Sequence, residues 1–506
     1  MESGSHDTQN MTVQQKDTSS YRSIFKATSL FGGVQVYNII IGIIKSKIIA
    51  VLLGTAGMGI MGLYQSTIGF IQGLTSMGLG QSAVRDVSEA NATGNTERIK
   101  HIVAVLKKLV WLTGILGMGI CLVFSPFLSR FTFGNYDYTI PFILLSSTLL
   151  IDQIRIGQGV LLQGLRRLKD LAKASTIGAT LGLIISIPFY YLFKVNGIAP
   201  TLVLTSIAYL IVNWFFVKKI KIQRKQVSIR TSLQDGRLMM KMGIAMTVNN
   251  IIVLGMAYLL RWFIRFQGGI EEVGLFTAGF TIVNTYAGMV FNAMATDYYP
   301  RLAAVNQDNN KGNLLINQQI EIATLIVAPL MVLCIVFMPL VIKILYSDQF
   351  LQANTFIIWA SAGIVFKTIS WALSYNFIAK GKARQFIINE IVAQLYSLPL
   401  QFGGYYLMGL KGLGIAFLVS YFLYSIQMYI VSNRQHEYQF SGSFVKEFLI
   451  QLLLLICVLT LALTLSQWRI YTYGSLFAFV SILLALRGLN ARLNLKRVFE
   501  NRLNSR

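Results

Sequence analysis

The sequence predicts an all-α polytopic membrane protein of about fourteen transmembrane helices, arranged as two six-helix lobes plus a C-terminal helix pair. Of its 506 residues, 54% are hydrophobic and only 13% are charged, with a mean hydropathy of +0.59. Such a composition cannot cover a soluble globular surface. Apolar runs of about 20 residues, the length that crosses a bilayer as a helix, recur along the chain. Both properties disfavour a soluble enzyme and a nucleic-acid-binding protein.

The first segment, residues 1–22, is polar and lacks the apolar region of a signal peptide. We therefore expect a cytoplasmic tail, with the first span acting as the insertion signal. Met11 offers a second candidate start, so the sequence leaves open whether residues 1–10 are native.

Fourteen apolar spans follow the tail, with boundaries uncertain by several residues. They lie at about 24–53, 58–84, 102–126, 139–163, 171–193, 199–217, 239–264, 272–296, 317–345, 353–378, 386–407, 412–431, 447–466 and 471–487.

The net charge of +24 follows the predicted topology. With the N-terminus inside, the predicted outer loops carry four of the 44 lysines and arginines, namely Arg130, Lys194, Lys411 and Arg469. Most of the others flank the cytoplasmic ends of the spans, as the positive-inside rule requires for an even number of spans. The basic charge is therefore mainly a topology signal, and both termini are expected in the cytoplasm.

Short matches between the two halves indicate an internal repeat. Residues 62–64, 164 and 190–199 correspond to residues 274–276, 381 and 405–416, at offsets between 212 and 217. An even number of helices per repeat keeps both copies in one orientation. The predicted divisions are a tail at 1–22, an N-terminal lobe at 23–222, a basic cytoplasmic linker at 223–238, a C-terminal lobe at 239–435, and a helix pair with a basic cytoplasmic tail at 436–506.

Polar residues at bilayer depth are costly and mark candidate functional sites. On the first span, Gln35, Asn38 and Lys45 recur at helical spacing and share one face. Lys47 lies about 200° around the helix from Lys45.

A second polar stripe, on the seventh span, consists of Asn250, Tyr258, Arg261 and Arg265. Two guanidiniums one turn apart repel each other unless an anion lies near them. The alternative is that both arginines snorkel to the nearby interface. A cavity role better explains why they share a face with Asn250 and Tyr258, so we expect both stripes to border one polar cleft.

Four further ionisable side chains complete the candidate site. Lys367 lies in mid-span without a local acid, which favours a cavity role. Asp152, Glu321 and Glu390 are candidates for ion coupling, because a carboxyl group in an apolar setting can titrate near neutrality. Equally, Asp152 could simply neutralise Arg155 three residues away, and the two glutamates could pair with neighbouring cations. The three cysteines are scattered, so no metal site, cofactor or disulfide is predicted, and no residue is assigned a catalytic role.

Several segments of the sequence resemble those of a known family. Residues 47–65, together with the glycine-basic endings of spans 4 and 10 at Gly164 and Gly381, resemble bacterial polysaccharide flippases. These O-antigen and related translocases belong to the superfamily of multidrug, oligosaccharidyl-lipid and polysaccharide exporters. The resemblance covers about residues 23–435. The terminal pair departs from the usual twelve-helix pattern and is similar to fourteen-helix relatives.

The resemblance implies a V-shaped, two-lobed carrier in the bacterial cytoplasmic (inner) membrane. It would move an undecaprenyl-diphosphate-linked oligosaccharide, an O-antigen or related lipopolysaccharide unit, to the outer leaflet, driven by membrane potential, ion coupling or both. The family pattern places a basic residue at Lys47, whereas the polar stripe favours Lys45, so both are candidate diphosphate ligands with Arg261, Arg265 and Lys367. Membrane lipids and other polysaccharide-assembly proteins are the expected partners, with no nucleic acid.

Two other functions remain as alternatives. A multidrug cation antiporter needs an anionic cavity, and here the mid-span cations outnumber the unpaired acids. A membrane glycosyltransferase or ligase needs a substantial outer loop, and every predicted outer loop is short. The sequence identifies neither the sugar, nor the coupling ion, nor the oligomeric state.

Overall fold

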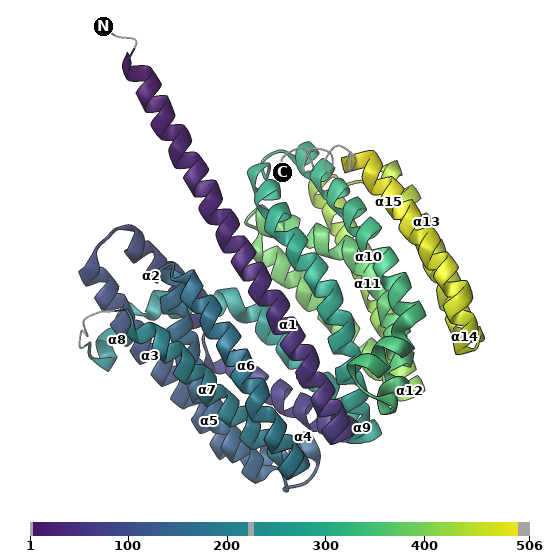
Figure 1. Cartoon of the computed structure of the whole chain (residues 1–506), viewed down its shortest axis with the longest axis horizontal. Coiled ribbons are helices and arrows are strands. Elements are labelled where there is room, and N and C mark those ends of the chain that lie inside the picture. The colour runs from purple at the N-terminus through teal and green to yellow at the C-terminus, as the bar shows by residue number, and fades with distance from the viewer. Residues whose placement is uncertain (1–3, 221–226, 494–506) are drawn as a thin grey trace. The chain divides into compact units, whose positions relative to one another are not determined.

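The structure is a computed structural model that describes residues 4–220 and 227–493, and it contains helices and no strand over those residues (Figure 1). Residues 1–3 of the predicted tail, residues 223–226 of the predicted linker and residues 494–506 of the C-terminal segment lie outside the described residues. The α-helices are α1 (Gly4–Thr75), α2 (Leu79–Ala92), α3 (Thr96–Val123), α4 (Ser125–Phe133), α5 (Thr139–Gly164), α6 (Leu168–Phe193), α7 (Ile198–Lys218), α8 (Ile229–Asp235), α9 (Arg237–Ala304), α10 (Asn309–Leu345), α11 (Asn354–Ala379), α12 (Ala383–His436), α13 (Gly442–Thr464), α14 (Gln467–Arg469) and α15 (Ser475–Leu493). Three short helices of other types are η1 (Lys194–Gly197), η2 (Asp348–Ala353) and η3 (Ile470–Gly474).

Ten helical stretches of the described chain are long and apolar enough to cross a membrane, and four of these are too long for one crossing. The four are Gly33–Thr75, Leu168–Lys218, Thr247–Ala304 and Ala383–His436, with 43 to 58 residues each. At 1.5 Å per residue, even the shortest is about 65 Å long, roughly twice the hydrocarbon core of a bilayer. Each contains a non-helical residue, at Gly54, Lys194, Gly269 and Gly409 respectively. Dividing the four stretches at these residues gives the fourteen crossings that the sequence predicts.

The backbone breaks support the internal repeat. Three pairs of residues with positive φ stand at one common offset of 215: Gly54 and Gly269, Arg166 and Gly381, and Lys194 and Gly409. The first and third pairs divide long helical stretches, and the second pair ends α5 and α11. A shared set of left-handed residues at one spacing indicates that both halves follow the same backbone path.

Several boundaries differ from the expected spans. The span expected at 58–84 is interrupted where Met77 and Gly78 adopt positive φ, so that α2 is a separate helix. The expected outer loop after the third span contains α4, and the expected linker contains α8. Hydropathy averaged over a span does not report the break at Met77, because residues 70–84 mix apolar residues with glycine and small polar residues on both sides of it.

Polar side chains cap four helices at their first turns. The side chains of Asn95, Ser228, Asp308 and Ser441 accept hydrogen bonds from backbone N–H groups of α3, α8, α10 and α13, at 3.0 to 3.2 Å. Such caps satisfy donors that a helix start leaves unpaired. All four caps lie at ends that the charge distribution assigns to the cytoplasm, where the chain leaves the bilayer.

The chain forms two compact units, each of which includes a segment from the other half of the sequence. Unit 1 consists of Met1–Leu53 and Tyr64–Leu254, and unit 2 consists of Gly54–Leu63 and Gly255–Arg506. The start of the second crossing thus packs within unit 2, and the first part of α9 packs within unit 1. The sequence-based lobe boundaries stay a proposal.

Unit 1 is built around α3, α5, α6 and α7, which pack against one another. Leu109, Val110 and Val160 belong to its buried core, at the end that the charge distribution assigns to the cytoplasm. The short helix α8 lies on α3, where His101 Nε2 and Asp235 Oδ2 are 2.9 Å apart. The linker between the predicted lobes is therefore attached to this unit at least over α8.

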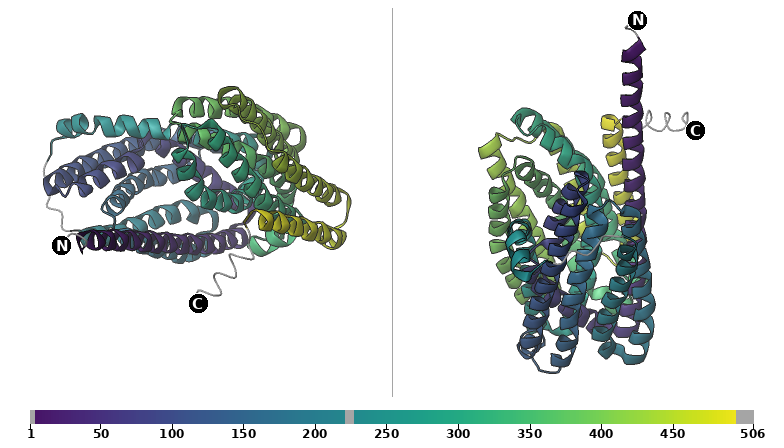
Figure 2. Two further views of the ribbon diagram at one scale, coloured as in Figure 1. Left: turned by 90° about the horizontal axis from the view of Figure 1, so that it is seen from above. Right: turned by 90° about the vertical axis from the view of Figure 1, so that its left-hand side faces the viewer.

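Unit 2 is centred on α10, α11 and α12, with α13 and α15 packed on α10. α13 and α15 also contact each other and make up the yellow end of the chain (Figures 1 and 2). Arg492 at the end of α15 donates to Glu321 Oε1 of α10 at 2.5 Å and to Ser443 Oγ of α13 at 2.9 Å. Gln451 and Ser481 exchange a second set of hydrogen bonds between α13 and α15.

Replacing Arg492 with alanine is expected to loosen the terminal pair. The substitution leaves Glu321, whose side chain is 10% exposed, without its cation, and hydrogen bonds to charged groups contribute about 1.5–3 kcal/mol each. We expect a lower thermal unfolding midpoint for the purified protein in detergent. Arg487→Ala is the matched control, because Arg487 is an exposed residue of α15. An equal midpoint for both variants would contradict a structural role for the ion pair.

Candidate functional site

The polar stripe of the first span belongs to unit 1 and faces α6 through Asn38. Asn38 Nδ2 donates to Ser175 Oγ at 3.0 Å, and Tyr37 Oη lies 2.7 Å from Thr180 Oγ1. Asn38 Oδ1 is buried and has no hydrogen-bond partner among the described residues. Gln35, one turn earlier, is exposed. The amide nitrogen of Asn38 is thus hydrogen-bonded, whereas its buried amide oxygen has no partner among the described residues.

Lys45 is the cation of this stripe. Seven residues of α-helix return almost to the same side, so Lys45 stands on the Asn38 side of α1 and Lys47 on the opposite side. Both lysines are half-buried. Within the described part of the chain, Lys45 makes no ion pair and no hydrogen bond. An ammonium group in this setting is a candidate ligand for an anion.

Arg261 is the most informative cation of unit 2. Its Nη1 donates to the carbonyl oxygen of Ala257 at 3.1 Å, and its guanidinium carbon lies 5.5 Å and 6.0 Å from the ring centres of Phe276 and Phe280. Its Nε is buried without a partner, and no described carboxylate pairs with it. Cation–π contacts contribute about 0.5–2 kcal/mol, less than the cost of removing a cation from water. The remaining donors therefore favour an anionic ligand.

The other members of the second stripe differ in burial and in the unit to which they belong. Arg265 is half-buried one turn after Arg261, and Tyr258 is 6% exposed. Asn250 is exposed and falls within unit 1. Whether these residues and the first-span lysines line one cleft stays a prediction.

Lys367 lies between aromatic rings in unit 2. Its Nζ is 5.7 Å from the ring centre of Phe291 and 5.2 Å from that of Tyr421. Glu390 lies close enough to interact with its charge and accepts a hydrogen bond from the hydroxyl of Tyr424. Lys367 and Glu390 thus belong to one polar region of α11 and α12, and Glu390 remains a candidate for ion coupling.

Sequence reasoning missed the polar side chains around that pair. Gln427 Nε2 donates to the carbonyl oxygen of Asn389 at 3.0 Å, and Tyr396 Oη donates to Gln427 Oε1 at 3.0 Å. Tyr421, Tyr424 and Gln427 recur every three residues, which is a helical-face signal that could have identified them.

The two remaining carboxylates have cationic partners. Asp152 accepts from Arg155 Nε at 2.9 Å and from Ser206 Oγ at 3.2 Å. Glu321 pairs with Arg492, as described above. Both observations favour the structural alternative over ion coupling for these two residues.

The glycine-basic ending of α11 ties three helices together. Lys380 Nζ donates to the carbonyl oxygen of Asn306 and to Asn309 Oδ1, each at 2.8 Å. Partial burial, followed by the charge of Lys382, lowers the pKa of Lys380 from its usual value. The role of this motif in the fold is to fix the turn between α11 and α12.

Each unit contains a close contact between two helices from different halves of the sequence that only glycine permits. In unit 2, a Cβ on Gly274 would lie 1.9 Å from the carbonyl oxygen of Thr55, and one on Gly59 would lie 2.0 Å from that of Ile270. We call this contact the Gly59–Gly274 crossing. It joins the second and eighth spans.

The second close contact is in unit 1. A Cβ on Gly78 would lie 2.1 Å from the carbonyl oxygen of Gly243, and one on Gly243 would lie 2.3 Å from that of Met77. This Gly78–Gly243 crossing joins the end of the second span to the start of the seventh. Small residues allow such backbone approach in membrane helices.

Comparisons with known proteins agree with these features. The family described as "Polysaccharide biosynthesis protein" matches residues 24–306. The lipid III flippase of Escherichia coli (strain K12) is 21% identical over 391 residues, which cover 76% of this chain and 92% of that protein. The relative from Shigella flexneri gives the same values.

Two solved structures share the fold. The lipid II flippase MurJ in an inward closed conformation has a TM-score of 0.68 at 13% identity, over 92% of this chain and 99% of that one. An inward-facing multidrug resistance MATE family transporter has a TM-score of 0.66 at 15% identity, over 79% and 94%. Residues 436–506 are about a seventh of the chain, so a match over 92% includes part of the terminal pair. These relatives are flippases and transporters, not enzymes.

Proposed function

Because the chain belongs to the polysaccharide biosynthesis protein family, and its described residues include ten helical stretches long and apolar enough to cross a membrane, we propose that it is a flippase for a lipid-linked oligosaccharide. The substrate is an undecaprenyl-diphosphate-linked O-antigen or related surface polysaccharide unit. It moves from the inner to the outer leaflet of the bacterial cytoplasmic membrane by alternating access. The similarity to lipid III flippase supports this substrate class.

The observation that carries the proposal is the guanidinium of Arg261, whose buried Nε has no hydrogen-bond partner and which pairs with no carboxylate among the described residues. Its open donors suit the oxygens of a diphosphate, which arginine binds through paired hydrogen bonds. Arg265, Lys367 and one of the two first-span lysines would supply the remaining positive charge. A multidrug cation antiporter is less well supported, because Arg261 and Lys45 lack carboxylate partners in the described chain while Asp152 and Glu321 are paired with arginines.

The two glycine crossings support alternating access. Each joins helices from different halves of the sequence, and the two contacts lie at opposite ends of the second span. We infer that the Gly59–Gly274 crossing closes the outer side and that the Gly78–Gly243 crossing closes the cytoplasmic side. Transport then requires each crossing to separate in turn.

The membrane potential can drive this cycle. Moving about two negative charges outward across 100 mV, negative inside, releases up to about 4.6 kcal/mol at about 2.3 kcal/mol per charge. The same field favours the return of the empty cationic carrier. Coupling to an ion through Glu390 is thus an addition to the mechanism and not a requirement.

Reconstituted vesicles test the proposed function. We expect a fluorescent undecaprenyl-diphosphate oligosaccharide to cross the bilayer only when the protein is present, and several-fold faster when a potassium diffusion potential drives the headgroup outward. The movement is followed by the quenching of the fluorophore with an impermeant reductant. Transport of a cationic dye in place of the lipid would contradict the proposal. Translocation that ignores the potential but follows a pH gradient would assign the driving force to carboxylate coupling.

A further inference from the structure

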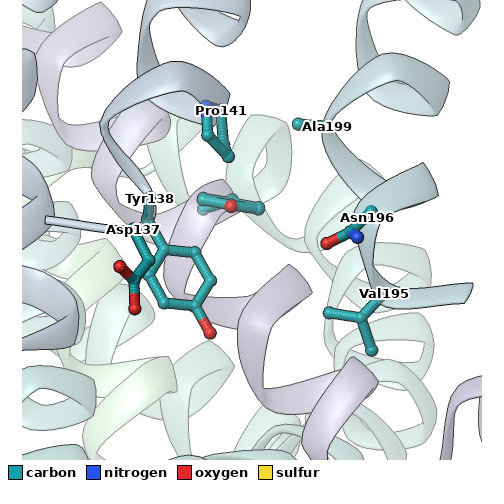
Figure 3. A pocket seen from close by; sticks show the side chains of 7 residues that line it. Asp137, Tyr138, Pro141, Val195, Asn196 and Ala199 are labelled. Atoms are coloured by element: carbon teal, nitrogen blue, oxygen red, sulfur yellow. The ribbon is translucent and has the colours of Figure 1, made fainter. Parts of the chain in front are cut away.

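A cavity of about 150 Å³ lies in unit 1 and is lined by residues of that unit. Its walls are the segment between α4 and α5 and the turn around η1. Figure 3 shows Asp137 and Tyr138 on one side and Asn196 on the other. The charge distribution assigns both segments to the outer side of the membrane.

Tyr64 lines this cavity and supplies an unpartnered hydroxyl group. Its side chain is 2% exposed, and the rings of Phe133 and Phe142 lie 5.3 Å and 5.5 Å from its own ring, centre to centre. Its hydroxyl has no hydrogen-bond partner in the described part of the chain. The hydroxyl is therefore available to donate or accept a hydrogen bond with an occupant of the cavity that carries polar groups.

Local contacts hold one wall of the cavity in place. Ser129 Oγ donates to the carbonyl oxygen of Asn135 at 2.7 Å and accepts from the backbone N–H of Tyr138 at 3.1 Å. The ring of Tyr138 stacks on Phe133 with 3.8 Å between ring centres. A preformed site lowers the ordering cost of binding.

The polar groups at the rim restrict the chemistry of the ligand. Asp137 and Asn196 are exposed, and the carboxylate of Asp137 has no ion-pair partner among the described residues. No lysine or arginine lines the cavity, which makes it unsuitable for a phosphate. The described residues offer no group of three side chains that could hold a metal ion.

A sugar ring fits these properties. A carboxylate, an amide and a phenol accept or donate hydrogen bonds to sugar hydroxyls, and aromatic side chains pack against the apolar face of the ring. Since each liquid water occupies about 30 Å³, the volume is that of about five waters, comparable to one pyranose ring. We propose that this cavity is a carbohydrate subsite that holds one neutral pyranose unit of the transported glycan. It rests on the proposed function for the role of the glycan, but not for the binding itself.

Saturation-transfer NMR on the purified protein in detergent tests the subsite directly. The probes are glucose, galactose, N-acetylglucosamine and glucuronate at millimolar concentration. We expect saturation transfer to the ring protons of at least one neutral sugar, and less to glucuronate, whose charge is repelled by Asp137. Tyr64→Phe and Asn196→Ala should each weaken binding about five- to tenfold. Tyr191→Phe is the matched control, because Tyr191 is an exposed tyrosine of the same unit outside the cavity.

The outcomes separate the subsite from the proposed function. Tyr64→Phe removes only an unpaired hydroxyl, so its thermal midpoint should equal that of the wild type and exclude misfolding as the cause. If no neutral sugar binds, or if both cavity variants bind as the control does, the subsite is overturned. Vesicle translocation by the wild type would then still support the flippase. Sugar binding without translocation would retain the subsite and reject the proposed function.

Discussion

Arg261→Gln is expected to reduce translocation of the lipid-linked diphosphate by about 10- to 100-fold. Glutamine keeps a polar side chain but removes the positive charge and the planar fork of donors. A hydrogen bond to a charged group contributes about 1.5–3 kcal/mol, which corresponds to this loss. Arg261→Lys should give an intermediate rate, since it keeps the charge without paired donors. The measurement is the initial translocation rate in vesicles at equal protein content.

The control for this series is Arg384→Gln, which changes an exposed arginine in the same unit. Its rate should match that of the wild type. Thermal unfolding of each variant separates loss of binding from loss of fold. Because the wild-type guanidinium is desolvated with an unpaired Nε, Arg261→Gln should not lower stability. A wild-type rate for Arg261→Gln would remove the main support for the diphosphate site.

Gly274→Ala and Gly243→Ala are expected to block transport by different routes. Each added Cβ would lie 1.9 Å or 2.3 Å from a backbone oxygen, so the corresponding crossing cannot close. We expect at least a tenfold loss of translocation in both variants. Gly288→Ala on the same helix is the matched control, because nothing lies within 4 Å of its added Cβ. A helical Gly→Ala change is otherwise stabilising by about 1 kcal/mol.

The two variants should favour opposite states of the cycle. In a background in which the three cysteines are replaced, a reporter cysteine at Gln35 is labelled by an impermeant maleimide from either side. Gly243→Ala should increase labelling from the cytoplasmic side, and Gly274→Ala from the outer side. Equal changes from both sides, or none, would contradict the assignment of the crossings as gates.

The crossing pattern of this fold is predictable from sequence, because each crossing is a local apolar run of known length. The repeat was also detectable, although matching Gly164 with Gly381 placed it two residues off, because the structure aligns Gly381 with Arg166. The separate helices α2, α4 and α8 were not, because short helices and the break at Met77 leave no hydropathy signal.

The candidate site was predictable only in part. Helical spacing selected Arg261 and offered the Asp152–Arg155 pair as one of two interpretations of Asp152, since both depend on local geometry. The partner of Glu321 lies 171 residues away on α15, and the rings around Arg261 come from beyond the break at Gly269. Such contacts depend on tertiary packing, which a single sequence does not reveal.

The equivalent turns of the two halves differ in the residues that form them. Where the second half has Gly381 and Gly409, the first half has Arg166 and Lys194, in the same left-handed backbone region. A side chain there costs about 1–2 kcal/mol per residue, so surrounding packing must hold these two turns in place. At these turns the C-terminal repeat has glycines, which adopt positive φ without strain. The N-terminal repeat has Arg166 and Lys194, which adopt it only with strain. Duplicated architecture therefore does not give the two halves turns of equal backbone strain.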